Sequence, residues 1–203
     1  MKQENNTNNN ILSKNKSSPM KKGIIFRIIA WIIMLVGGTL LGILLDRIWF
    51  PLLWHSAIFH ILIFIPGALL MWLVFHTSRV TGRLLAKQGR EGEIPRMETN
   101  RLVVDGIYGC MRHPMHLGLL FFPLSLAMIL GSTTFIIMIA PLEMLLMIFM
   151  IKILEEPEAI AKFGDQYREY MKNVPMFNFS PKCLRYLFSP AENENKTENE
   201  NQK

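Results

Sequence analysis

The stretch LGLLFFPLSLAMILGSTTFIIMIAPLEMLLMIFMIKI, residues 117–153, decides the fold, because it is apolar almost throughout. Its main polar interruptions are Gly131-Ser132-Thr133, Glu143 and Lys152. A helix needs about 20 apolar residues to cross the hydrocarbon core of a bilayer. The stretch is therefore long enough for two membrane-spanning helices that are joined by a tight turn at Gly131.

Two further apolar blocks precede this stretch. Gly23–Leu45 contains Arg27 as its single charge, and Ile58–Phe75 contains none. The first block is too long and too far from the N-terminus for a signal peptide, so we expect it in the mature protein. Together the apolar blocks predict an all-α polytopic membrane protein with about four transmembrane helices.

Gly38 and Gly42, in the first predicted span, have the spacing of a small-xxx-small face. Such a face lets a neighbouring membrane helix approach closely. Glycine is also tolerated in membrane helices without a packing role, so both interpretations stay open.

The net charge of +6 on this 203-residue chain is unevenly distributed. Lysine and arginine concentrate before the first predicted span, between the second and third, and after the fourth, whereas the other two connections carry only Arg47. The positive-inside rule then places both termini and the loop that contains Arg112 in the cytoplasm. We attribute the basic charge to topology and anionic lipid headgroups, not to nucleic acid. Cys110 and Cys183 are too few for a disulfide framework or a CxxC metal site, and we predict no metal.

The ends of the chain differ from its middle. Residues 1–20 are rich in asparagine and residues 187–203 in asparagine and glutamate, so both are predicted to be disordered tails around a membrane domain at 21–186. A helix from Pro157 is predicted as a cytoplasmic C-terminal amphipathic helix on the membrane surface. Its apolar face comprises Ile160, Phe163, Tyr167, Tyr170, Met171 and Val174. It either covers part of a site or has no role in chemistry.

Polar residues gather where the third predicted span begins, at Pro114. Arg112 and His113 lie just outside that helix N-terminus, toward which free backbone N–H groups and the positive end of the helix dipole point. The hairpin of the third and fourth spans returns Glu155-Glu156 to the same end. The cluster is either an interfacial ion pair or a site for a zwitterionic, aromatic or cationic small molecule, with an apolar groove for a lipid-like partner. Glu143, in mid-span, is either functional or a protonated acid bonded to a neighbouring helix.

Two patterns resemble the isoprenylcysteine carboxyl methyltransferase family and the related phospholipid N-methyltransferases. The first is Leu102-Val103-x-x-Gly106-x-Tyr108-x-x-x-Arg112-His113-Pro114-Met115-x-x-Gly118, and the second is Glu155-Glu156 followed by Phe163-Gly164-x-x-Tyr167-x-x-Tyr170-x-x-x-Val174-Pro175. Together they cover about residues 100–175. The resemblance implies a membrane methyltransferase that uses S-adenosylmethionine, with a lipid-like or prenylated acceptor. It also implies the cofactor-binding residues Leu102, Val103, Tyr108, His113, Pro114, Met115, His116, Glu155 and Glu156.

The chain departs from the family pattern at two positions. His116 stands where the family has tyrosine, and Ile151 stands where the prenylcysteine enzymes have an arginine for the substrate carboxylate, with Lys152 adjacent. His116 and Arg112 are the candidate catalytic residues, and Lys152 and Glu143 the candidate substrate-binding residues. An amine acceptor must lose a proton, so His116 is either a base for such an acceptor or a ring that packs against the cofactor. The alternatives are a phospholipid amine N-methyltransferase and a non-catalytic membrane protein with a relic cofactor hairpin.

Overall fold

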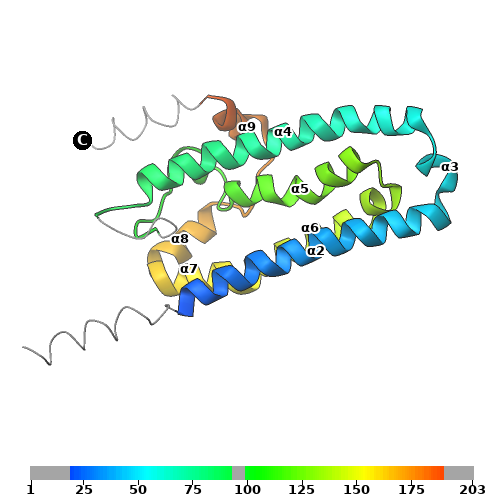
Figure 1. Ribbon diagram of the computed structural model, residues 1–203. Helices are drawn as coiled ribbons and strands as arrows, with labels where there is room; N and C mark the ends of the chain where they lie inside the picture. Colours follow the sequence, from blue (N-terminus) through cyan, green and yellow to red (C-terminus); the bar gives the residue numbers. More distant parts are fainter. Residues whose placement is uncertain (1–18, 93–98, 190–203) are drawn as a thin grey trace, which may run out of the picture.

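The computed structural model describes residues 19–92 and 99–189, and every regular element in these ranges is a helix (Figure 1). Most of both predicted disordered tails lies outside these ranges. The long elements are α2 (Pro19–Trp49), α4 (Ala57–Gln88), α5 (Pro114–Leu130) and a composite helix of η2 (Phe135–Ile139), α6 (Ala140–Met150), η3 (Ile151–Glu155) and α7 (Glu156–Phe163). The short elements are α3 (Pro51–Trp54), η1 (Gly106–Gly109), α8 (Asp165–Asn173) and α9 (Pro181–Phe188).

Within the described ranges, three helices are long and apolar enough to cross a membrane: Arg27–Trp49, Ala57–Gln88 and Phe135–Phe163. The third predicted span, α5, is also apolar but has only 17 residues, which is the lower limit for a membrane helix. The all-α polytopic fold is therefore confirmed, with three long spans and one short apolar helix. The predicted turn at Gly131 is also confirmed, because this glycine ends α5 in the left-handed region at φ 65°.

Glycines let the helices approach one another closely at several positions. A Cβ atom on Gly42 of α2 would lie 2.9 Å from Ser132 Oγ, and one on Gly38 would lie 2.6 Å from Glu143 Oε1. Of the two interpretations left open for Gly38 and Gly42, close helix approach is the one that the structure shows. Gly67 of α4 has the same role, since its Cβ would lie 2.7 Å from the Cβ of Met128 in α5.

Asp46 ties the end of α2 to the beginning of the composite helix. It is 1% exposed, and its Oδ1 accepts hydrogen bonds of 2.7 Å from both the backbone N–H and the hydroxyl of Thr134. The carboxylate thereby satisfies a backbone donor that a helix N-terminus leaves free. These two hydrogen bonds connect α2 with the composite helix at the end of the bundle opposite the predicted site (Figure 1).

The single amphipathic helix predicted from Pro157 to Val174 is wrong. The chain passes from η3 into α7 without a new start at Pro157 and then breaks at Gly164, whose φ of 60° interrupts the helix before α8. The break turns Tyr167 and Tyr170 inward, so both are buried. The sequence interpretation also missed α9, whose N-cap Ser180 accepts a hydrogen bond from Cys183 N–H at 3.4 Å. Because α9 extends to Phe188, the predicted domain end at residue 186 lies inside this helix.

Candidate active site

A cavity of about 220 Å³ lies at the end of the bundle where α7 and α8 are located. Its walls come from the last turns of α4, the loop before α5, the first turn of α5, the end of η3, and helices α7 and α8. Of the predicted site residues, those that line it are Leu102, Val103, Tyr108, Arg112, His113, Pro114, Met115, His116 and Glu155. The sequence motif around Arg112 and the distant Glu155 are thus two walls of one cavity.

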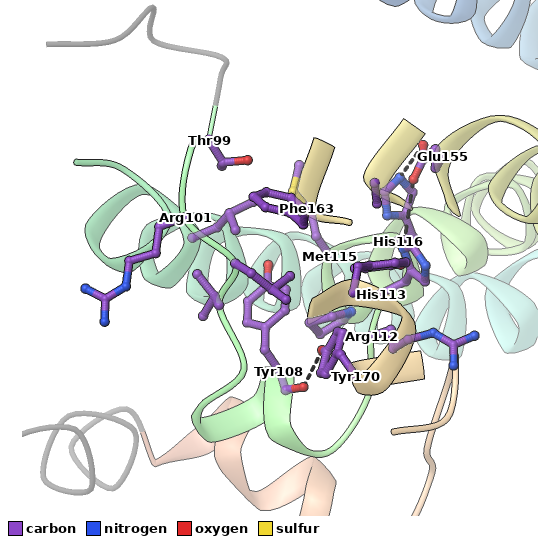
Figure 2. A pocket seen from close by; sticks show the side chains of 16 residues that line it. Thr99, Arg101, Tyr108, Arg112, His113, Met115, His116, Glu155, Phe163 and Tyr170 are labelled. Carbon is purple, nitrogen blue, oxygen red and sulfur yellow. Dashed lines mark hydrogen bonds and ion pairs between the residues drawn. The ribbon is translucent and has the colours of Figure 1, made fainter. Parts of the chain in front are cut away.

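Glu155 contacts two imidazoles at this cavity (Figure 2). His116 Nε2 lies 3.0 Å from its Oε1, and His113 Nδ1 lies 3.9 Å from its Oε2. Burial, reinforced by the charge of His116, lowers the pKa of His113 to about 4, so His113 is neutral near pH 7. A neutral His113 does not offset the negative charge of Glu155, so the nearer His116 is the imidazole that pairs with this carboxylate.

Glu156 has a different environment from its neighbour. Its Oε1 lies 2.6 Å from Nη2 and 3.2 Å from Nε of Arg112, and both side chains are about nine-tenths buried. Arg112 Nη1 donates further bonds to the carbonyls of Met171 at 3.0 Å and Val174 at 2.7 Å. Glu156 is absent from the cavity wall, and the Arg112 donors are already occupied. The geometry thus favours a structural role for this pair over the predicted catalytic role of Arg112 and cofactor contact of Glu156.

Backbone bonds close the cavity from the side of α8. Arg112 N–H donates to Pro175 O at 2.9 Å and His113 N–H to Met176 O at 3.2 Å, so the residues after α8 lie against the loop before α5. The Tyr170 hydroxyl donates to the carbonyl of Tyr108 in η1. Burial raises the pKa of Tyr108 and Tyr170 above the usual range, so both hydroxyls remain protonated donors.

The π-helical turn η3 ends at Glu155 and contains Ile151 and Lys152. Ile151 is 1% exposed and packs inside the bundle, whereas Lys152 is exposed and does not line the cavity. Glu143 is 5% exposed and lies against Gly38 of α2, away from the cavity wall. The two predicted substrate residues, Lys152 and Glu143, are therefore not brought to this site.

Among the residues that the structure describes, seven more line the cavity that the site prediction did not include. They are Leu85, Thr99, Arg101, Ala159, Phe163, Tyr167 and Tyr170. Phe163, Tyr167 and Tyr170 were visible in the second sequence pattern, and their aromatic spacing was the signal that marked them. Arg101 carried no such signal, and Figure 2 shows its guanidinium directed away from the imidazoles.

The same cluster has a geometry that a divalent cation could use. Donor atoms of His113, His116 and Glu155 all lie within 4.8 Å of one another. Two imidazoles and a carboxylate are ligands that zinc accepts. The absence of a metal, which we expected from the cysteine count, therefore stays a prediction.

Comparison with known proteins places this architecture in a family. The profile of the phospholipid methyltransferase family matches residues 61–166. Protein-S-isoprenylcysteine O-methyltransferase of Schizosaccharomyces pombe is 36% identical over 81 residues, which are 39% of this chain and 34% of that protein. The structure of the eukaryotic intramembrane Ras methyltransferase, isoprenylcysteine carboxyl methyltransferase, superposes with a TM-score of 0.51 at 21% identity.

That superposition covers 74% of this chain and 52% of the solved chain, so this chain spans about half or less of the relatives it matches. At 21% identity the structural likeness concerns the fold, which is an integral multi-pass membrane fold. The family profile extends from the first turns of α4 to the beginning of α8 and includes the whole hairpin that carries the site. The chain therefore belongs to the phospholipid methyltransferase family.

Proposed function

We propose that the chain is an S-adenosylmethionine-dependent methyltransferase of the membrane, with a lipid-like or prenylated methyl acceptor. The observation that carries the proposal is the Glu155 carboxylate, which faces a cavity of aromatic and apolar walls and has imidazoles as its contacts. Family membership supports the same reaction class.

The cavity residues fit this cofactor by their chemistry. Glu155 would hold the ammonium group, because Glu156 is already paired with Arg112. Tyr108 and Phe163 offer aromatic faces for the adenine and for the sulfonium. When bound, the cofactor supplies a methyl group that is activated for in-line displacement. The chain then contributes mainly the orientation of two bound partners.

Two acceptor classes are consistent with the site. The Schizosaccharomyces pombe relative is an O-methyltransferase, and a carboxylate acceptor is already ionised and needs no base. We favour this class for the present chain. A phospholipid amine is the second candidate, because His116 lies 3.0 Å from Glu155, which can orient the imidazole as a base for an amine.

We further propose that both termini and the cavity face the cytoplasm. The support is the lysine and arginine distribution, which leaves only Arg47 at the α3 end. Cysteines introduced at Arg83 and at His55, in a variant without Cys110 and Cys183, would test this orientation in spheroplasts or intact cells. An impermeant maleimide should label position 55 from outside and position 83 only after the membrane is opened, and the reverse pattern would refute the orientation.

Two measurements on the purified protein test the function. Titration calorimetry in detergent should show S-adenosylmethionine binding, and its complete absence in folded protein would refute the enzyme proposal. Transfer of a radiolabelled methyl group to a farnesylcysteine analogue, compared with transfer to a membrane lipid extract, then separates the two acceptor classes.

A further inference from the structure

Arg27 of α2 is a cation at the same end of the bundle as the cavity, where Figure 1 shows the beginning of α2 close to α7. Its guanidinium forms an ion pair with Glu158, one turn of α7 beyond Glu155. Arg27 also interacts electrostatically with Glu155 itself. A helix that lies outside both sequence patterns thus brings a positive charge to the carboxylate side of the site.

The Arg27 guanidinium is available to a ligand in a way that the Arg112 guanidinium is not. Arg112 donates to Glu156 and to two backbone carbonyls, which occupies both ends of its planar group. The partner of Arg27, Glu158, has a side chain that is 62% exposed, and the Arg27 side chain is 23% exposed. Because Glu158 is largely exposed and Arg27 is not fully buried, an incoming anion can reach the guanidinium and take the place of Glu158.

The surroundings of Arg27 are those of a lipid-facing surface. Ile28 and Ile32 of α2 are each 49% exposed, as expected of side chains that contact acyl chains. Trp31, about one helical turn or roughly 6 Å from Arg27 along the axis, packs its ring 5.1 Å from that of Phe122 in α5. An anion at Arg27 therefore has an apolar helix surface directly beside it, which suits an amphiphile better than a free ion.

We infer that Arg27 binds the anionic headgroup, a carboxylate or a phosphate, of the lipid-like methyl acceptor and so determines acceptor specificity. The inference rests on the proposed function and adds the element that selects the acceptor. A prenylated carboxylate and a phospholipid both carry such an oxyanion. Bound at Arg27, the head of the acceptor lies beside α7, on the side of the bundle that carries Glu155 and Glu158.

Direct binding can be measured without turnover. In a variant that keeps Trp31 and replaces Trp49, Trp54 and Trp72 by phenylalanine, a brominated fatty acid in nanodiscs should quench Trp31 fluorescence. Arg27→Gln should weaken this quenching about tenfold in apparent affinity, whereas the brominated methyl ester should be insensitive to the substitution. Inorganic phosphate should not relieve quenching, and equal competition by phosphate would overturn the assignment to a lipid headgroup.

Methyl transfer separates recognition from a merely structural ion pair. Arg27→Gln should raise the KM for an anionic acceptor about tenfold and leave the Kd for S-adenosylmethionine within twofold. Glu158→Gln frees Arg27 and should leave that KM unchanged or lower it. If Arg27 only fastens α2 to α7, both substitutions should impair the protein equally, and this result would overturn the inference.

Arg47→Gln, at the exposed opposite end of α2, is the matched control and should change neither KM nor quenching. Arg27→Lys keeps the charge and should retain most of the anion binding if the glutamine variant does not fold. Failure of the wild type to methylate any acceptor would refute the proposed function, but the quenching experiment would still decide whether Arg27 binds a lipid anion. Unchanged quenching in folded Arg27→Gln protein would overturn the inference.

Discussion

Arg112 and Glu156, which are separated by 44 positions in the chain, form a buried ion pair with an Nη2–Oε1 distance of 2.6 Å. The same guanidinium bonds the carbonyls of Met171 and Val174 near the end of α8. One side chain therefore connects the loop before α5 with α7 and α8. These are three of the elements that form the walls of the cavity.

We expect Arg112→Lys to lower the free energy of unfolding by about 2–3 kcal/mol, because it removes buried hydrogen bonds that a charged group donates. Lysine keeps the charge but lacks the planar group that reaches Glu156 and two carbonyls together. Denaturation of the purified protein in mixed micelles measures the change. Arg168→Lys, in an exposed pair with Asp165, is the control and should cost less than about 0.5 kcal/mol. Equal effects of the two substitutions would contradict the structural role of Arg112.

Glu155→Gln should weaken S-adenosylmethionine binding tenfold or more, which corresponds to about 1.4 kcal/mol. The substitution keeps the size of the side chain but removes the charge that would pair with the ammonium group. Titration calorimetry gives the affinity, with Glu158→Gln as a matched control on the exposed side of α7 that should bind the cofactor normally. Wild-type affinity in a folded Glu155→Gln protein would mean that another group holds the ammonium.

Gly67→Ala should destabilise the protein by about 1–3 kcal/mol, in the range of an overpacked core. The new Cβ would lie 2.7 Å from Met128 Cβ and 2.9 Å from Ile129 N, and backbone atoms cannot move aside independently. Gly82→Ala, on the same helix, has nothing within 4 Å of its Cβ and should stabilise α4 by up to about 1 kcal/mol. Thermal denaturation of both variants measures the difference, and similar melting temperatures would argue against close packing of α4 on α5.

Cys183 should resist alkylation in the folded protein. It is fully buried, and burial raises the pKa of its thiol to about 12, so almost no reactive thiolate is present at pH 8. In a Cys110→Ser background, we expect a maleimide to label Cys183 only after denaturation, as followed by mass spectrometry. Rapid labelling under native conditions would show that α9 opens readily from α4 and η1.

The purified protein should contain well below one equivalent of bound metal. The donor atoms of His113, His116 and Glu155 are close enough for a cation, but in our proposal Glu155 serves the ammonium of the cofactor. Elemental analysis by mass spectrometry after purification without chelators tests this expectation. A stoichiometric metal that is lost in His116→Ala would assign the cluster to a metal and would require a different cofactor contact.

Much of the fold could be predicted because its signals are local. The length of the apolar blocks determines which segments can be buried in a bilayer, and Gly131 permits the left-handed turn that divides residues 117–153 into a hairpin. The hairpin in turn implies that Arg112 and His113 meet the pair Glu155-Glu156. The break at Gly164 was missed, because a helical pattern of apolar residues does not reveal one residue with positive φ. Helix α9 was missed as well.

The different roles of Glu155 and Glu156 at the site could not be predicted from the sequence in the same way. Successive residues of a helix differ in direction by about 100°, so neighbouring glutamates face different surroundings. The π-helical turn η3 changes the helical register up to and including Glu155, and its place in the chain is not evident from the apolar residues around it. For this reason the sequence did not indicate that Glu156 and Lys152 are absent from the described cavity wall.

The sequence alone determined the membrane character, the hairpin and the motif from Leu102 to His116, because burial of long apolar segments and local backbone preferences depend on neighbours in the chain. Only the tertiary structure decided that Glu156 pairs with Arg112 while Glu155 faces the cavity. It also decided that Arg27 of α2 lies near Glu155. Arg27 and Glu158 are 131 positions apart. Contacts over such separations depend on how whole helices pack, and the packing of several helices is a property of their combined surfaces rather than of any one segment.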